Sequence, residues 1–272
     1  MIEGRNAVIE ALRAGVAIDK VFIAKGETDS TLRHIASLAR EAGAVVVEAD
    51  RRKLDSMCEE RTEERTGERT EGRTGERTGG RTGEQARQHS HQGVVAVAAC
   101  TEYVTIDDIL QSAMDKKEDP LIVLCDGVSD PHNLGAIIRT CEAAGAHGVV
   151  IPKRRSAGLG ATVAKTSSGA VYHLPVARVT NLNSTIAELK KAGLCVIGAA
   201  ATGETPVWQA DLSGPAAIVV GGEGTGISRL VGENCDFQVS IPMFGKLSSL
   251  NVSVSAAILV YEAVRQRGFV IK

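Results

Sequence analysis

The stretch Phe237-Gln-Val-Ser-Ile-Pro-Met-Phe-Gly-Lys-Leu-Ser-Ser-Leu-Asn-Val-Ser-Val254 contains a strand, a turn and the start of a helix. The apolar strand ends at Pro242, and a proline-to-glycine turn follows it. An apolar helix is predicted next, at 252–265. Small polar residues crowd the mouth of this helix: Ser248, Ser249, Asn251 and Ser253. One such residue is enough to cap a helix, so the surplus indicates a ligand site.

The same alternation of strand and helix extends back to Leu121. Apolar runs predict strands at 121–125, 148–151, 171–176, 194–200, 216–220 and 236–241, and helices at 134–144, 159–168, 184–192, 227–233 and 252–266. Continuous Val/Ile strands separated by helices are typical of a parallel sheet covered on both faces. We therefore predict an α/β fold, with ligands bound beyond the carboxyl ends of the strands. The loops after residues 125, 200, 220 and 241 are the candidates.

Composition excludes several classes of protein. Of the 272 residues, 43% are hydrophobic and 24% charged, as in ordinary soluble domains, and no apolar run is long enough to span a membrane. The N-terminus lacks a signal-peptide pattern, and the six cysteines form no CxxC pair. We expect reduced thiols, a cytoplasmic protein and no metal site. A net charge of −2 and 3% aromatic residues mean that any nucleic acid would be bound through local basic patches.

The chain before Leu121 has its own organisation. Residues 1–100 are predicted to form a small α/β domain, 101–119 a polar linker, and 120–272 a second domain. An Arg-Thr-x-x repeat from Arg61 to Glu84, with x being Glu or Gly, interrupts the first domain. Because this tract contains no apolar residue, it is interpreted as a disordered insertion at about 60–88. An RNA-binding arginine tract is the alternative, although the interleaved glutamates oppose it.

The loop after residue 125 leads into a helix with two candidate functional residues. Asn133 is placed to cap this helix, and Arg139 lies one turn in, away from the apolar stripe. A guanidinium at the ligand edge of the sheet suits a phosphate. The alternative is a capped helix with a solvated arginine.

The loop after residue 220 reads Gly221-Gly-Glu-Gly-Thr-Gly-Ile-Ser228. Ile227 stands where a nucleotide-triphosphate loop has its lysine, and no GxGxxG spacing is present. The glycines indicate a backbone that approaches a ligand closely. Glu223 is the one charged side chain in the loop, either functional or merely exposed.

These loops resemble a known family. Asn133-Leu-Gly-Ala-Ile-Ile-Arg-Thr140, Gly221–Ile227 and Ile241-Pro-Met with Ser249-Leu-Asn-Val-Ser253 resemble the three motifs of the SpoU/TrmH family, which are RNA ribose 2'-O-methyltransferases of the SPOUT class. Lys165-Thr-Ser-Ser-Gly-Ala170 resembles the pattern between those motifs. Glu3–Val8 and His91-Gln-Gly93 are similar to the L30e-like substrate-binding domain of bacterial 23S rRNA guanosine 2'-O-methyltransferases.

The resemblance implies a trefoil knot near 221–254, a homodimer, and S-adenosylmethionine as methyl donor without a metal. It assigns cofactor binding to Gly221, Gly222, Ile241, Met243 and Leu250. It assigns catalytic roles to Asn133, Arg139, Glu223, Ser249 and Asn251. The proton acceptor stays open, with Glu223 a candidate. Two departures from the family pattern are the Arg-Thr tract and Ser255, where alanine is more common.

The expected substrate is a guanosine ribose in 23S rRNA, because the additional N-terminal domain suits a large folded RNA. The alternatives are a tRNA guanosine 2'-O-methyltransferase and a non-catalytic RNA-binding assembly factor. Basic residues expected to contact RNA are Arg5, Arg13, Lys153, Arg154, Arg155 and Lys165. For 153–155, a solvated loop is the alternative.

Overall fold

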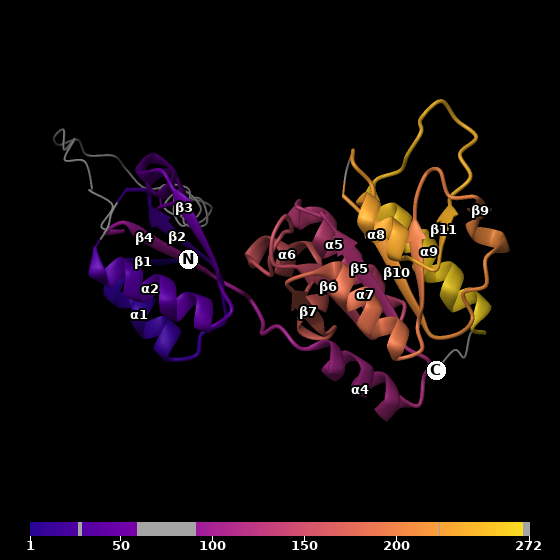
Figure 1. Cartoon of the computed structure of the whole chain (residues 1–272), viewed down its shortest axis with the longest axis horizontal. Coiled ribbons are helices and arrows are strands. Elements are labelled where there is room, and N and C mark those ends of the chain that lie inside the picture. The colour runs from indigo at the N-terminus through magenta and orange to yellow at the C-terminus, as the bar shows by residue number, and fades with distance from the viewer. Residues whose placement is uncertain (27–28, 59–90, 223, 269–272) are drawn as a thin grey trace, which may run out of the picture. The chain divides into compact units, whose positions relative to one another are not determined.

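The computed structural model of the chain describes residues 1–26, 29–58, 91–222 and 224–268 (Figure 1). The described residues belong to two compact units, Met1–Ala98 and Ala99–Lys272. The insertion predicted at about 60–88 lies outside the described residues.

The first unit is a small sheet with helices packed on it. Its strands are β1 (Ile2–Glu3), β2 (Ile18–Ala24), β3 (Val45–Ala49) and β4 (Val94–Ala98), and its helices are α1 (Arg5–Arg13) and α2 (Ser30–Glu41), with residues 51–58 also helical. The strand order is β1-β4-β2-β3, with β2 and β3 parallel and the other pairs antiparallel. This unit is a small α/β domain, as predicted from the sequence.

A buried histidine joins the two sides of the undescribed insertion. His91 is buried, and its Nε2 lies 3.1 Å from Oδ1 of Asp55. Its Nδ1 accepts a hydrogen bond of 2.9 Å from the backbone N–H of Gly93, so Nε2 carries the proton that Asp55 accepts. Leu54 and Cys58 are buried nearby in the core under β2 and β4. The chain on either side of the insertion is thus held by contacts that do not involve it.

We expect the insertion to be dispensable for folding. Replacing residues 60–89 with a six-residue Gly/Ser linker should change the free energy of unfolding by no more than about 1.5 kcal/mol, because loop closure depends weakly on loop length. The matched variant His91→Ala should cost about 1–3 kcal/mol, because it removes both hydrogen bonds at this buried site. Denaturant unfolding followed by circular dichroism measures both. A deletion more damaging than His91→Ala would contradict the account.

The second unit is a seven-stranded sheet with helices on both faces. Its strands are β5 (Leu121–Asp126), β6 (Gly148–Pro152), β7 (Val176–Val179), β8 (Cys195–Ala199), β9 (Thr205–Pro206), β10 (Ala216–Gly221) and β11 (Phe237–Ser240). Its helices are α4 (Ile106–Lys116), α5 (Pro131–Ala143), α6 (Ala161–Thr166), α7 (Leu182–Lys191), α8 (Arg229–Asn234) and α9 (Val252–Gln266), with short 3-10 turns η2 (Ala170–Tyr172) and η3 (Val207–Gln209).

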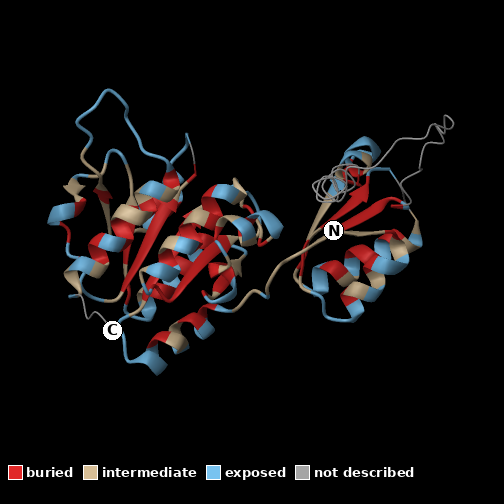
Figure 2. Cartoon of the chain, turned by 180° about the vertical axis from the view of Figure 1, so that it is seen from behind, coloured by how far each residue is buried: buried red, intermediate tan, exposed pale blue. Residues whose placement is uncertain are grey.

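All neighbouring strands of this sheet are parallel, in the order β7-β6-β5-β10-β8-β11-β9. Helices α5, α6 and α9 pack on one face, and α4, α7 and α8 on the other. The central strands β5, β6 and β10 are therefore buried from both sides, as Figure 2 shows in red. This confirms the predicted parallel α/β domain and explains why its strands are continuous apolar runs.

Two predictions for this unit were wrong. Residues 101–119 are not a simple linker, because α4 lies within them and belongs to the second unit. A capping box between Thr105 and Asp108 starts α4, and Ile106 and Ile109 bury its apolar side against the sheet. The strand predicted at 171–176 is instead the turn η2 followed by β7. Its apolar residues are buried because the turn packs into the core, so burial alone misled the strand assignment.

The C-terminal strands do not lie in the sheet in the order in which they follow along the chain. β10 lies between β5 and β8, and β11 pairs on the far side of β8. From there the chain returns, so that α9 packs against α5 and β10 (Figure 1). The trefoil knot implied for 221–254 requires such a return, and the knot itself stays a prediction.

All six cysteines are free thiols, and Cys58, Cys125 and Cys141 are buried. Burial raises the pKa of the Cys125 thiol to about 12. Among the helices that the structure describes, none is long and apolar enough to cross a membrane.

Candidate active site

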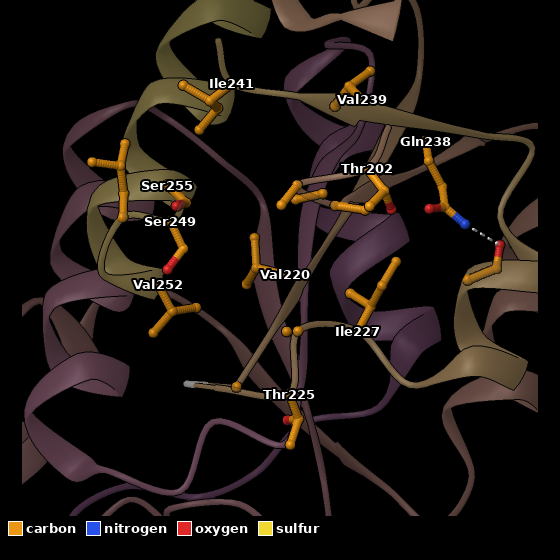
Figure 3. A pocket seen from close by; sticks show the side chains of 18 of the residues that line it. Thr202, Val220, Thr225, Ile227, Gln238, Val239, Ile241, Ser249, Val252 and Ser255 are labelled. Atoms are coloured by element: carbon orange, nitrogen blue, oxygen red, sulfur yellow. Dashed lines mark hydrogen bonds between the residues drawn. The ribbon is translucent and has the colours of Figure 1, made fainter. Parts of the chain in front are cut away.

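A cavity of about 600 Å³ lies at the carboxyl ends of β8, β10 and β11. Its wall comes from residues 199–202 after β8, from the glycine loop after β10, and from the segment between β11 and the first turn of α9. Figure 3 shows Val220 between Ser249 and Ser255 on one side and Thr202 and Gln238 on the other. The cavity therefore has an apolar floor and hydroxyl or amide groups on opposite walls, an arrangement that suits a ligand with apolar and polar parts.

The glycine loop is packed too closely to accept side chains. A Cβ on Gly221 would overlap the backbone of Gly226 and Ile227, and one on Gly222 would overlap the carbonyl oxygen of Gly127. Backbone hydrogen bonds fix this geometry, because Gly222 N–H donates to Asp126 O at 2.8 Å and Gly226 N–H donates to Gly222 O at 3.0 Å. The loop thus brings bare backbone to the cavity wall, as predicted. Glu223 lies outside the described residues.

Asn133 and Asn251 meet beside the cavity. Asn251 Nδ2 donates a hydrogen bond of 2.9 Å to Asn133 Oδ1, across 118 positions of sequence. Asn251 caps α9 and directly follows Leu250, which lines the cavity. Asn133, predicted as a helix cap, lies instead inside the first turn of α5. The cap is Asp130, which accepts from His132 N–H at 3.0 Å, because Pro131 suits the first helical position and moves the start of the helix forward.

Arg139 lies on the exposed side of α5. It is six residues, or about 9 Å along the helix axis, beyond Asn133. Since α5 starts at Pro131, Arg139 lies more than two turns in rather than one, and it is not part of the cavity wall. Within the part of the chain that the structure describes, no hydrogen bond or ion pair engages its guanidinium. The group is available to a ligand at the surface.

Two parts of the chain match models of known protein families. Residues 120–261 match the model of the SpoU rRNA Methylase family, and residues 1–64 match that of the RNA 2'-O ribose methyltransferase substrate binding family. The chain belongs to the SpoU family. A Bacillus subtilis relative named "Putative TrmH family tRNA/rRNA methyltransferase YacO" is 42% identical over 97% of this chain and 94% of its own length.

Solved structures give the same result for the fold. The SpoU methyltransferase AviRb from Streptomyces viridochromogenes, in complex with the cofactor AdoMet, aligns with a TM-score of 0.56 and 25% identity over 98% of this chain and 89% of its own. A structure titled as an RNA 2'-O ribose methyltransferase aligns with a TM-score of 0.51 and 27% identity, over 98% and 88% of the two chains. The protein is therefore an S-adenosylmethionine-dependent RNA methyltransferase of the SpoU family.

The cavity of this SpoU protein fits S-adenosylmethionine. Its volume lies within the range of small-molecule sites, and its exposed glycine backbone can approach a ligand without side-chain interference. Every residue predicted to bind the cofactor lines it: Gly221, Gly222, Ile241, Met243 and Leu250. Met243 and Leu250 are 37% and 38% exposed, which places them at the rim. Ser249, predicted as catalytic, also lines the cavity.

Sequence reasoning missed part of the wall. Thr202, Gln238 and Ser255 line the cavity but were not proposed as site residues. The loop after residue 200 was recognised as a candidate, and this was the available signal for Thr202. Gln238 lies within a strand, where only the fold shows which way it faces; its Nε2 donates to Gly232 O at 3.2 Å.

The predicted RNA-contacting residues lie in several places. Lys153, Arg154 and Arg155 follow β6, with the two arginines exposed, and Lys165 is exposed on α6. In the first unit, Arg13 is exposed, and its Nη1 lies 3.2 Å from Oε1 of Glu10.

Arg5 has a different setting from the other basic residues. It pairs with Asp29, the cap of α2, and its Nε donates to Gln92 O at 2.9 Å. This arginine therefore joins α1, the cap of α2 and the turn before β4, and these contacts limit its reach toward RNA.

Among the described residues, no three His, Cys, Asp or Glu side chains gather in a way that could hold an ion.

Proposed function

We propose that this protein methylates the 2'-hydroxyl of a guanosine ribose in 23S rRNA, with S-adenosylmethionine as the donor. The observation that carries the proposal is the pairing of a methyltransferase unit with a separate unit that matches the RNA 2'-O ribose methyltransferase substrate binding family. A small second unit suits a large folded RNA, because shape and backbone contacts at two places can select one nucleotide.

When bound in the cavity, S-adenosylmethionine would supply the methyl group from its sulfonium and leave a neutral thioether. The protein must then place the 2'-oxygen in line with the methyl group and help it lose its proton. We assign alignment to Ser249 and Asn251, which lie at or beside the cavity wall. Val220 and Ile227 give the cavity an apolar surface, which would keep water away from the reacting centre.

Arg139 is proposed to hold the phosphate next to the target ribose. Its guanidinium is exposed, and such a group binds phosphate through two parallel hydrogen bonds. A positive charge there also stabilises a developing 2'-alkoxide. An arginine side chain stays protonated in proteins and is therefore a poor proton acceptor, so another group takes this role, and Glu223 is the candidate.

We propose that the enzyme is a homodimer in the cytoplasm. Support comes from apolar side chains that are exposed to solvent in a single chain. Phe244 is 99% exposed and Leu247 76% exposed, and Val254 and Tyr261 on α9 are also exposed. Exposed apolar groups concentrated on one segment are typical of interfaces. Light scattering should give a mass twice the 28.5 kDa of one chain. A measured mass equal to that of one chain would contradict the proposed homodimer.

The test is transfer of labelled methyl groups to separated RNA pools. Protein, labelled S-adenosylmethionine and unmethylated 23S rRNA or tRNA are incubated, and label is counted in each pool. We expect label in 23S rRNA. Label in tRNA alone would favour the tRNA alternative, to which the "tRNA/rRNA" in the name of the Bacillus subtilis relative gives support. Binding of both pools without label would favour the non-catalytic RNA-binding factor.

A further inference from the structure

Asp126, the last residue of β5, accepts hydrogen bonds from both ends of the glycine loop. Its backbone oxygen accepts from the N–H of Gly222 at 2.8 Å, and its side-chain Oδ2 accepts from the N–H of Ser228 at 2.7 Å. Ser228 lies 102 positions further along the chain. The described residues between these two donors, 224–227, all line the cavity. One residue of β5 therefore holds the loop both where it begins and where it ends.

The two contacts make different demands on the sequence. The backbone contact continues the pairing of β5 with β10, in which Asp126 lies opposite Gly221, and any residue could supply it. The contact with Ser228 needs a side-chain oxygen on a short stem, which aspartate and asparagine provide. An ionised acceptor also makes a stronger hydrogen bond than a neutral one. The carboxylate is thus the part of Asp126 that the sequence specifies.

The far end of the loop determines where Ile227 lies. Ile227 lines the cavity and directly precedes Ser228. Its Cδ1 would be 3.0 Å from a Cβ placed on Gly198 and 3.4 Å from one on Gly232, so its side chain fits closely between β8 and α8. Because packing this close leaves little free space, a displacement of Ser228 would move Ile227 and change the shape of the cavity wall.

Asp126 does not line the cavity, so it can act on a bound ligand only through the loop. We propose that Asp126 is a positioning residue for S-adenosylmethionine: its carboxylate holds Ser228 and so keeps the glycine loop in the shape that receives the cofactor. This inference concerns cofactor binding and does not depend on which RNA is methylated. The alternatives are a carboxylate that only stabilises the fold and a carboxylate that accepts the proton of the 2'-hydroxyl.

Two variants of Asp126 separate these possibilities. Asp126→Ala removes the acceptor, so cofactor binding would have to order the loop, and S-adenosylmethionine affinity should fall about 10–100-fold, the scale for one hydrogen bond to a charged group. Asp126→Asn keeps an oxygen acceptor at the same place but is neither charged nor basic. Its affinity should stay within about fivefold of wild type. Isothermal titration calorimetry measures both affinities at a temperature where each variant is folded.

The matched control is Asp236→Ala. Oδ2 of Asp236 also accepts a backbone N–H at 2.7 Å, from Val196 on β8, and Oδ1 pairs with Lys190, but Asp236 does not line the cavity. This variant should lower the Tm because it loses both contacts. Its cofactor affinity should stay within about twofold of wild type. The comparison separates loss of stability from loss of loop geometry.

Two further readouts distinguish positioning from the alternatives. In the ligand-free protein, amide exchange followed by NMR should be at least about tenfold faster at Ser228 in Asp126→Ala than in wild type or Asp126→Asn. At saturating S-adenosylmethionine, single-turnover methyl transfer by Asp126→Ala should return to within about threefold of wild type, because Asp126 acts on binding and not on the reacting groups.

Unchanged cofactor affinity of folded Asp126→Ala, or unchanged exchange of the Ser228 amide, would leave the carboxylate a structural role only and overturn the proposal. An equal loss of turnover in Asp126→Ala and Asp126→Asn at saturating cofactor would also overturn it, because it would make Asp126 the proton acceptor. If the wild-type protein binds the cofactor but methylates no RNA, the proposed function fails, whereas calorimetry and amide exchange still decide the role of Asp126.

Discussion

Replacing Gly221 with alanine is expected to abolish S-adenosylmethionine binding. The added Cβ would overlap the backbone atoms of Gly226 and Ile227, which cannot move without opening the turn that shapes the cavity wall. Overpacking of this kind costs about 1–3 kcal/mol or more. If the strain is relieved by displacing the loop, affinity for the cofactor should fall at least about 100-fold. Isothermal titration calorimetry measures the affinity directly.

The matched control is Gly214→Ala. A Cβ at Gly214 would meet no atom within 4 Å, and its backbone is not in the left-handed region. Its affinity and unfolding free energy should stay within about 0.5 kcal/mol of wild type. Circular dichroism establishes that Gly221→Ala is folded under the assay conditions. Normal cofactor affinity in a folded Gly221→Ala protein would mean that the glycine loop does not form the cofactor site.

Arg139→Ala is expected to reduce turnover on RNA by about 10²–10³-fold, the scale found when a preorganised charge or donor is removed from a transition state. The side chain is exposed and engages no described residue. Unfolding free energy should therefore change by no more than about 0.5 kcal/mol. Cofactor affinity should also be unchanged, because Arg139 does not line the cavity. Single-turnover methyl transfer separates the chemical step from RNA binding.

Arg139→Lys distinguishes charge from geometry. Lysine keeps the positive charge but cannot form the two parallel hydrogen bonds of a guanidinium with phosphate. We expect it to restore only a small part of the lost activity. Near-full turnover of this variant with unchanged RNA affinity would contradict the proposed clamp.

The sequence predicted the second unit well because its strands are buried on both faces. Runs such as Leu121–Cys125 and Ala216–Val220 are apolar throughout and are separated by helices of clear periodicity. The same criterion failed where irregular backbone is buried. Val171 and Leu174 lie in the core although they belong to a turn and its exit, so a buried run there resembled a strand.

The sequence predicted the part of the cavity wall that is formed by backbone. It did not predict contacts between side chains that are far apart in the sequence. The glycines of the loop after β10 indicated close approach, and that loop lines the cavity. The hydrogen bond between Asn133 and Asn251 joins residues 118 positions apart, and only the packing of α5 on α9 brings them together. The cap of α5 was misplaced for a local reason, because Asp130-Pro131 is a stronger start than Asn133.

The most direct test of the central claim is the chemical identity of the methylated nucleoside. Unmethylated 23S rRNA is incubated with the protein and S-adenosylmethionine, digested to nucleosides, and analysed by mass spectrometry. The account predicts 2'-O-methylguanosine, formed by the wild-type protein and almost absent with Arg139→Ala. A methyl group on a base, or 2'-O-methylation found only in tRNA, would contradict it.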